Sequence, residues 1–226
     1  MSKILYISPK DNTLKFTNKI YKCISKAISA IDLIEIDYSD KSHENTLAII
    51  SESTKNDLII FAGHGGSDYL QGSVDRDYNS YKKERFIDTS NIHILQGKKF
   101  ISISCNSSDK LGKLASENGV ISFMGFGGLP TDNEIIEVLN KPLPEINAMF
   151  KGELVSIISN ALSLGITKNY NFVEFQSLIR YFSNKSMRKI LRTNTKHKTI
   201  LADHIFNIHF ENKIFGDSFS QLFDLK

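Results

Sequence analysis

The sequence has few of the residues from which disulfide frameworks, zinc sites and membrane spans are built. Only two cysteines occur among its 226 residues, and neither Cys23 nor Cys105 has another cysteine or a histidine at a metal-ligating spacing. A disulfide-rich scaffold and a zinc ribbon are therefore excluded, and a reducing cytoplasm is the expected setting. No run approaches the roughly 18 apolar residues of a membrane span. The four apolar residues before Pro9 are too few for a secretory signal, so we expect no membrane association.

An excess of charge of either sign is also missing. Lys and Arg number 28 and Asp and Glu number 25, which leaves a net charge of +3. With 41% hydrophobic and 23% charged residues, the composition is that of an ordinary globular protein and excludes a disordered chain, a fibre or a histone-like polycation. The four prolines and thirteen glycines are scattered, and no repeat of fixed period is present. We therefore expect one domain over residues 1–226.

The apolar pattern of the first 126 residues predicts alternating strands and helices. Strands are expected at 4–7, 33–36, 58–62, 100–104 and 120–126, and helices at 14–30, 47–50 and 111–115. This alternation indicates an α/β fold with a mostly parallel sheet and helices on both faces. Residues 130–200 are expected to form a mainly helical part of the same domain, with helices at 134–139, 153–164 and 172–191. A last strand is expected at 204–210.

Polar residues that could carry chemistry follow the third and fourth predicted strands. Gly63-His64-Gly65 comes directly after 58–62, and Cys105 comes directly after 100–104. If these strands are neighbours, both side chains converge on the crevice beyond the carboxyl ends of the sheet. An imidazole beside a thiol can generate the thiolate and later protonate a leaving amine, and the backbone N–H groups of Gly65 and Cys105 could donate to an oxyanion. Cys23, by contrast, is expected to be a packed residue of the first helix.

This arrangement resembles the caspase-like cysteine peptidases, and within them the bacterial CHAT domain. The matching segments are Leu58–Gly65, ending in Gly-His-Gly, and Phe100–Cys105, with Cys105 placed 41 positions after His64. Gly119–Gly127, Gly152-Glu153-Leu154 and Phe215-Gly216-Asp217 also resemble family segments. The departures are Ser104 where Ala is usual, Ser218 where Pro is frequent, and Ile103 where several members carry Asp, Glu or Gln. No acidic determinant of substrate choice is therefore carried over.

The resemblance implies a caspase-like three-layer sandwich with Cys105 as nucleophile and His64 as general base and acid. It further implies a cysteine endopeptidase that cleaves a protein substrate without a cofactor or metal. The expected protein is a regulated bacterial protease with a role in antiviral defence, controlled by a separate sensor or activator protein. The alternative is a catalytically silent scaffold of the same fold that binds a protein or RNA partner.

Other enzyme classes fit the same residues less well. The chain has no Gly-x-Ser-x-Gly or Gly-x-Cys-x-Gly elbow, which disfavours an α/β-hydrolase, and no phosphate-binding Gly-x-x-x-x-Gly-Lys-[Ser/Thr] motif. A cysteine phosphatase needs an arginine where this chain has Leu111. A helical zinc site on His43 fails because position 47 is leucine, and His204 and His209 would face opposite sides of the predicted strand.

Two further segments carry hypotheses. The polar stretch 68–90 is too long for an ordinary connection. It is either a substrate or activation loop beside the active site or a mobile surface excursion, and we favour the first, with a loop that is mobile in the free protein. The stretch 176–202 contains seven lysines and arginines and no acid. Four of these cations, Lys185, Arg188, Lys189 and Arg192, share one helical face. That face would suit an acidic protein or RNA, although a solvated surface is the simpler interpretation.

Overall fold

The computed structural model describes residues 2–73, 85–131, 137–138, 141–142 and 144–223. The sheet at its centre contains six strands in the order β10-β7-β6-β3-β1-β2. Their bounds are β1 Ile4–Pro9, β2 Ile31–Ile36, β3 Leu58–Ala62, β6 Lys99–Ile103, β7 Ser122–Gly125 and β10 Lys213–Gly216. All neighbours pair in parallel except β10, which runs antiparallel to β7 at one edge.

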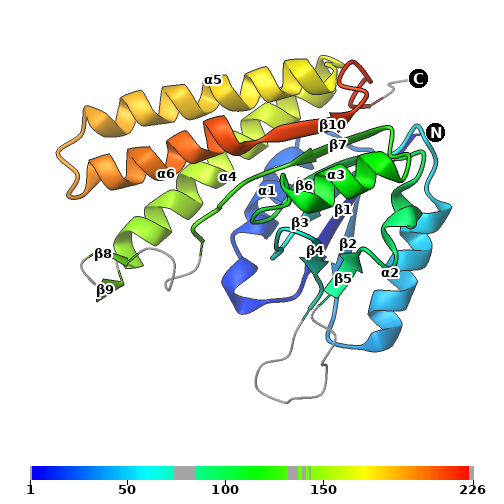
Figure 1. The fold of residues 1–226 in the computed structure, drawn as a ribbon. Coiled ribbons are helices and arrows are strands. Elements are labelled where there is room, and N and C mark those ends of the chain that lie inside the picture. The colour runs from blue at the N-terminus through cyan, green and yellow to red at the C-terminus, as the bar shows by residue number, and fades with distance from the viewer. Residues whose placement is uncertain (1, 74–84, 132–136, 139–140, 143, 224–226) are drawn as a thin grey trace.

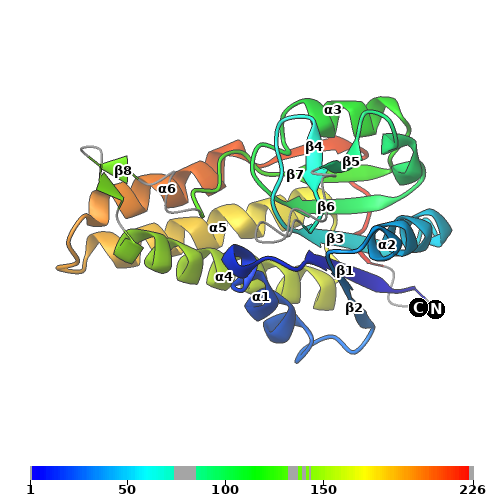
Figure 2. The same cartoon turned by 90° about the horizontal axis from the view of Figure 1, so that it is seen from below.

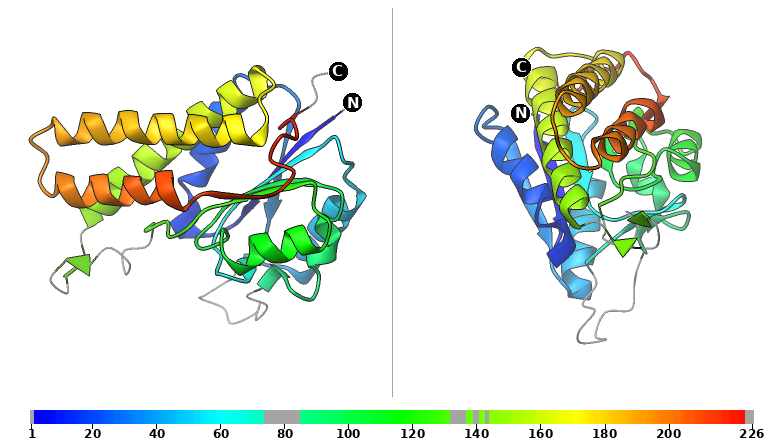
Figure 3. Two further views of the ribbon diagram at one scale, coloured as in Figure 1. Left: turned by 45° about the horizontal axis from the view of Figure 1, so that its top comes forward. Right: turned by 90° about the vertical axis from the view of Figure 1, so that its left-hand side faces the viewer.

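Helices cover both faces of this sheet, so the α/β three-layer arrangement expected from the sequence is confirmed. The helices are α1 Thr17–Ile24, α2 Asp40–Glu52, α3 Lys110–Glu117, α4 Pro144–Thr167, α5 Phe172–Leu191 and α6 Lys198–Glu211. Figures 1 and 2 show α2 and α3 on one face, and α1 with the bundle of α4, α5 and α6 on the other. In Figure 3, α5 and α6 run side by side over α4. Within the described residues, none of the helices combines the length and apolar character needed to cross a membrane.

The strands divide their side chains between two cores, because successive residues of a strand point to opposite faces. On β3, Ile60 and Ala62 face the core shared with α1 and the α4–α6 bundle, and Phe61 faces the core under α2 and α3. On β6, Ile101 and Ile103 face the bundle side in the same way. All five residues of β3 and all five of β6 are buried, as expected of central strands covered on both sides.

The strand predicted at 204–210 is wrong, because these residues belong to α6. Leu201, Ile205 and Ile208 are among its buried residues, and their spacing of four and three is the helical period. In the sequence, Phe206, Ile208 and Phe210 alternate with polar residues, which gives this helix the appearance of a strand, although Phe206 and Phe210 are exposed. The antiparallel strand of this region is β10, which lies further along the chain and was not predicted.

Three other expectations need correction. The helix predicted at 14–30 is a single 3-10 turn, η1 (Asn12–Leu14), followed by the shorter α1. Cys23 lies on the exposed side of α1, so it is not the packed core residue that was expected. Of the helix predicted at 134–139, Glu137–Val138 forms the short strand β8, paired with β9 (Lys141–Pro142), and the rest lies outside the described residues.

Candidate active site

His64 and Cys105 lie at equivalent places just beyond the carboxyl ends of two neighbouring strands. Ala62, the last residue of β3, pairs with Ile103, the last residue of β6, and each of the two candidate residues comes two positions later in its own segment. Cys105 packs against the core on the bundle side. Adjacent strands are about 4.8 Å apart. The backbone therefore brings both residues to the carboxyl edge of the sheet, at the ends of neighbouring strands.

Backbone contacts join the two segments on both sides of this pair. Before it, the Gly63 N–H donates to the Ile103 carbonyl at 3.2 Å; after it, the Leu111 N–H donates to the Ser67 carbonyl at 2.7 Å. Gly65 itself lies against Ser104, because a Cβ added at position 65 would come within 2.8 Å of the Ser104 Oγ. The glycine is therefore needed for the close approach of the two segments, one residue from each candidate side chain.

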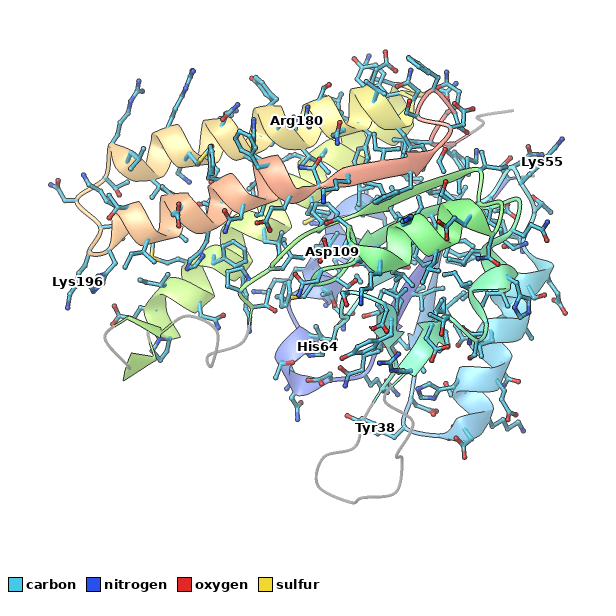
Figure 4. All side chains as sticks on the ribbon, viewed as in Figure 1. Tyr38, Lys55, His64, Asp109, Arg180 and Lys196 are labelled. Carbon is cyan, nitrogen blue, oxygen red and sulfur yellow. The ribbon has the colours of Figure 1, made fainter. Side chains whose placement is uncertain are left out.

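The imidazole of His64 is tied to the residues that follow β1. Its Nε2 lies 2.8 Å from the Thr13 hydroxyl and 3.6 Å from an Asp11 carboxylate oxygen (Figure 4). The Thr13 hydroxyl donates its own proton to Asp11 Oδ1 at 2.7 Å, so toward His64 it must act as an acceptor. This assigns the proton of the neutral imidazole to Nε2 and makes Nδ1 the ring atom that can take up a proton.

Asp11 is held in its ionised form at this position. Burial alone would raise the pKa of its carboxyl, but the interaction with His64 and the hydrogen bonds from the Thr13 hydroxyl and N–H hold that pKa well below its usual range. Sequence reasoning did not select Asp11 or Thr13. The signal in the sequence is that both residues follow the carboxyl end of the first predicted strand, and the place of β1 next to β3 appears only in the structure.

Cys105 is partly buried and begins a tight turn between β6 and α3. Its Sγ donates to the Leu129 carbonyl at 3.1 Å, and the next residue, Asn106, has a φ of 56°. Asparagine tolerates this left-handed conformation better than most residues, which allows the chain to reverse directly after the thiol. The Ser107 hydroxyl is 3.2 Å from the Ser102 carbonyl and 3.1 Å from the Ser104 carbonyl, and it fixes the turn to β6.

Gly65 also takes part in a short antiparallel bridge with Leu70. The bridge is closed by the Gly66 N–H on the Tyr69 carbonyl and by the Gln71 N–H on the His64 carbonyl. The N–H of Gly65 lies outside both hydrogen bonds, which is consistent with the expectation that it serves as a donor to another group.

The stretch 68–90 is more ordered at its ends than its composition predicted. β4 (Tyr69–Gln71) and β5 (Arg85–Asp88) pair as antiparallel strands with Leu70 and Ile87 buried, and residues 74–84 lie outside the described residues. His43 fixes this hairpin to α2: its buried ring hydrogen-bonds through Nδ1 to the Ser39 carbonyl and accepts the Ser73 N–H on Nε2 at 3.1 Å. His43 is thus a structural residue.

The basic residues of α5 form an exposed surface along the helical layer, away from His64 (Figure 4). A shallow groove on this helix is lined by Tyr181, Asn184, Lys185, Arg188, Lys189 and Arg192. Glu153 of α4 forms an ion pair with Lys189 at 3.7 Å, so part of the positive charge is compensated from the neighbouring helix.

In the described part of the chain, no group of three or more His, Cys, Asp or Glu side chains is arranged to hold a metal ion. No family model, curated protein or solved structure matches the chain.

Proposed function

We propose that this protein is a cysteine endopeptidase in which Cys105 is the nucleophile and His64 the general base and acid. The observation that carries the proposal is that these two residues follow paired positions of adjacent parallel strands by the same two residues, at the carboxyl edge of the sheet. The contact of His64 Nε2 with Thr13 and Asp11 supports it further, because a base held by a third group is the usual arrangement around an activated nucleophile.

In the proposed reaction, the S–H bond of Cys105 turns from the Leu129 carbonyl to His64, whose Nδ1 takes the proton. The thiolate attacks the carbonyl carbon of a peptide bond, and the N–H groups of Gly65 and Cys105 stabilise the oxyanion. His64 then returns the proton to the leaving amine, which leaves a thioester on Cys105. A water molecule, deprotonated by His64, attacks the thioester carbonyl and the C–S bond breaks, which releases the second product as a carboxylic acid. The Cys105 thiolate then takes the proton back from His64.

Asp11 and Thr13 have a positioning role in this proposal. They fix the proton of the neutral ring on Nε2 and favour the imidazolium that forms when Nδ1 is protonated, since the Asp11 carboxylate is 3.6 Å away. The resemblance to the CHAT domain adds the proposal of a regulated bacterial protease with a separate activator, acting in the cytoplasm on a protein substrate.

A catalytically silent scaffold is the second candidate, and the exposed basic groove on α5 is the observation in its favour. One experiment separates the two functions. The purified wild-type chain and the Cys105→Ala and His64→Ala variants are each incubated with a proteome from the same cells, with and without the products of neighbouring genes, and newly formed protein termini are sequenced. We expect new termini with the wild type alone. New termini with Cys105→Ala would refute the assignment, and none with any protein would favour the scaffold.

A further inference from the structure

The turn that carries Cys105 is held by the segment that follows β7. The Phe126 carbonyl accepts the Ser108 N–H at 3.0 Å, the Gly127 carbonyl accepts the Asn106 N–H at 2.8 Å, and the Leu129 carbonyl accepts the Cys105 thiol. The backbone of 126–129 therefore provides acceptors along the whole turn. Whatever fixes this segment also fixes the position of the thiol.

One carboxylate from the helical bundle fixes the segment 126–129. Glu211, the last residue of α6, accepts the Gly128 N–H on Oε2 at 2.8 Å. Its side chain also lies directly on Gly127, since a Cβ added at position 127 would fall 2.4 Å from the Glu211 Cβ. Residue 127 must therefore be glycine for Glu211 to reach the next N–H.

The end of α6 is itself held in place. Asn212 is buried, and its side-chain amide donates to the His209 carbonyl at 3.1 Å and to the Ile208 carbonyl at 2.5 Å. Gln176 of α5 donates to the Asn212 carbonyl at 3.0 Å. The end of α6, which carries the Glu211 carboxylate, is therefore held by hydrogen bonds within α6 and by one from α5.

Helix energetics do not explain an acid at this position. The C-terminal end of a helix carries a partial negative charge, so a glutamate there is locally unfavourable and a lysine or arginine would be preferred. Residues that conflict with their local structure are expected where another function requires them. Here the glutamate is needed because it accepts the Gly128 N–H.

We infer that Glu211 is a positioning residue for Cys105, which couples the helical bundle to the nucleophile through Gly128 and the segment 126–129. The inference rests on the proposed role of Cys105 as nucleophile. It adds a connection between the bundle and the sheet edge, so that a displacement of the α6 end is transmitted to the thiol.

The test uses the full chain with Glu211→Ala, Glu211→Gln and, as a matched control, Asp203→Ala, which removes one exposed acid from the same helix. Amide hydrogen exchange is measured for Asn106, Ser108 and Gly128, with Gly63 as an internal reference in the same sheet. We expect roughly tenfold or faster exchange at the three amides in Glu211→Ala. Gly63, and all four amides in Asp203→Ala, should exchange as in the wild type.

Glu211→Gln keeps an oxygen acceptor for the Gly128 N–H and should restore protection, because the hydrogen bond rather than the charge does the positioning. In peptidase assays, Glu211→Ala should lower kcat by roughly 10- to 100-fold with little change in KM, since the nucleophile and not the substrate is displaced. Unchanged exchange in Glu211→Ala, or a Gln variant as unprotected as the Ala variant, would overturn the inference. An exchange effect in a chain whose wild type cleaves nothing would instead count against the peptidase function alone.

Discussion

The carboxylate of Asp11 and the imidazole Nε2 of His64 lie 3.6 Å apart, and the Thr13 hydroxyl interacts with both groups. This chain of contacts comes from the loop after β1, whereas the candidate nucleophile comes from the loop after β6. The proposed base is therefore held by residues that belong to a different loop from the proposed nucleophile. Loss of the Asp11 or Thr13 side chain should lower the rate of catalysis more than it lowers the stability of the fold.

Substitution of Thr13 tests the contacts among Asp11, Thr13 and His64 directly. Thr13→Val keeps the shape but removes the hydroxyl that accepts from Nε2 and donates to Asp11. We expect it to lower kcat/KM by roughly 10- to 100-fold, the range of one hydrogen bond to a charged group, whereas Thr13→Ser should remain near the wild type. The measurement is steady-state hydrolysis of a peptide identified from the new protein termini. Equal activity of the Val and Ser variants would contradict the prediction.

Asp11→Asn should have a similar effect, because the amide cannot stabilise the imidazolium by charge. The activity of the variant should therefore fall below that of the wild type at neutral pH, where the reaction is assayed. Asp37→Asn is a suitable control: Asp37 hydrogen-bonds to Ser39 in a similar turn, but on the exposed loop after β2. An activity loss of the same size in Asp37→Asn would show that the effect is structural.

Acid should weaken the fold through Asp57. This buried carboxylate accepts hydrogen bonds from the Lys3 N–H, the Thr54 N–H and the Thr54 hydroxyl. Burial acts to raise its pKa, but these hydrogen bonds outweigh burial and lower it. Because the folded pKa lies below the unfolded value of about 3.9, the stabilisation is present above that pH and is lost as the pH falls through the folded pKa.

The expected result is that Asp57→Ala destabilises the protein by about 1–3 kcal/mol at pH 7, since it removes three hydrogen bonds to a charged, buried carboxylate. The difference from the wild type should narrow below about pH 4. Urea unfolding at pH 7, 5 and 3 measures both effects. Asp32→Ala, an exposed acid on β2, should show neither. If the difference in free energy of unfolding between the wild type and Asp57→Ala grew on acidification, the pKa of Asp57 would not be lowered by folding and the prediction would be refuted.

The two cysteines give a test of thiolate formation within one molecule. Cys23 is exposed, so an alkylating reagent reaches it freely and its rate reports ordinary thiol reactivity. If His64 generates the Cys105 thiolate, His64→Ala should slow alkylation of Cys105 by roughly tenfold or more and leave Cys23 unchanged. Mass spectrometry of peptides after timed exposure to iodoacetamide measures both rates. A Cys105 rate that is independent of His64 would count against the dyad.

The sequence predicted the central strands well for a physical reason. β3 and β6 are covered on both faces, so they appear as uninterrupted apolar runs, and the polar residues that end them are easily seen. The positions of His64 and Cys105 followed from these strand ends. Asp11 was missed because its role depends on strand order: β1 lies next to β3, and this adjacency is not visible in the chain itself.

Other features were missed because local patterns were ambiguous. The helix α6 carries exposed Phe206 and Phe210, which disturb the apolar stripe from which a helix is recognised. Cys23 is surrounded by apolar residues in sequence, yet the buried side of the short α1 is set by Ile20 and Ile24. The contact between Glu211 and Gly128 joins residues 83 positions apart and leaves no local signal.

The close approach of Gly65 to Ser104 should make position 65 intolerant of any side chain. A Cβ there would lie 2.8 Å from the Ser104 Oγ and 3.0 Å from its Cβ, so the segments that carry His64 and Cys105 would have to separate. A displacement near one ångström at reacting groups costs on the order of a hundredfold in rate. We therefore expect Gly65→Ala to lower kcat/KM by about that factor and to destabilise the fold by about 1–3 kcal/mol.

Two further variants make this prediction specific. Ser104→Ala combined with Gly65→Ala removes the nearest atom and should recover part of the activity, because the approaches of 3.0 Å to the Ser104 Cβ and 3.1 Å to the Tyr69 carbonyl oxygen are what remain. Gly152→Ala is the matched control: it lies inside α4 and its added Cβ would meet no neighbour within 4 Å. That substitution should leave activity unchanged and stabilise the protein by up to about 1 kcal/mol, because alanine is the better helix former. Peptidase assays and thermal unfolding are carried out on the wild type, Gly65→Ala, the double variant and Gly152→Ala. A fully active Gly65→Ala would show that catalysis does not need the close approach of the two segments.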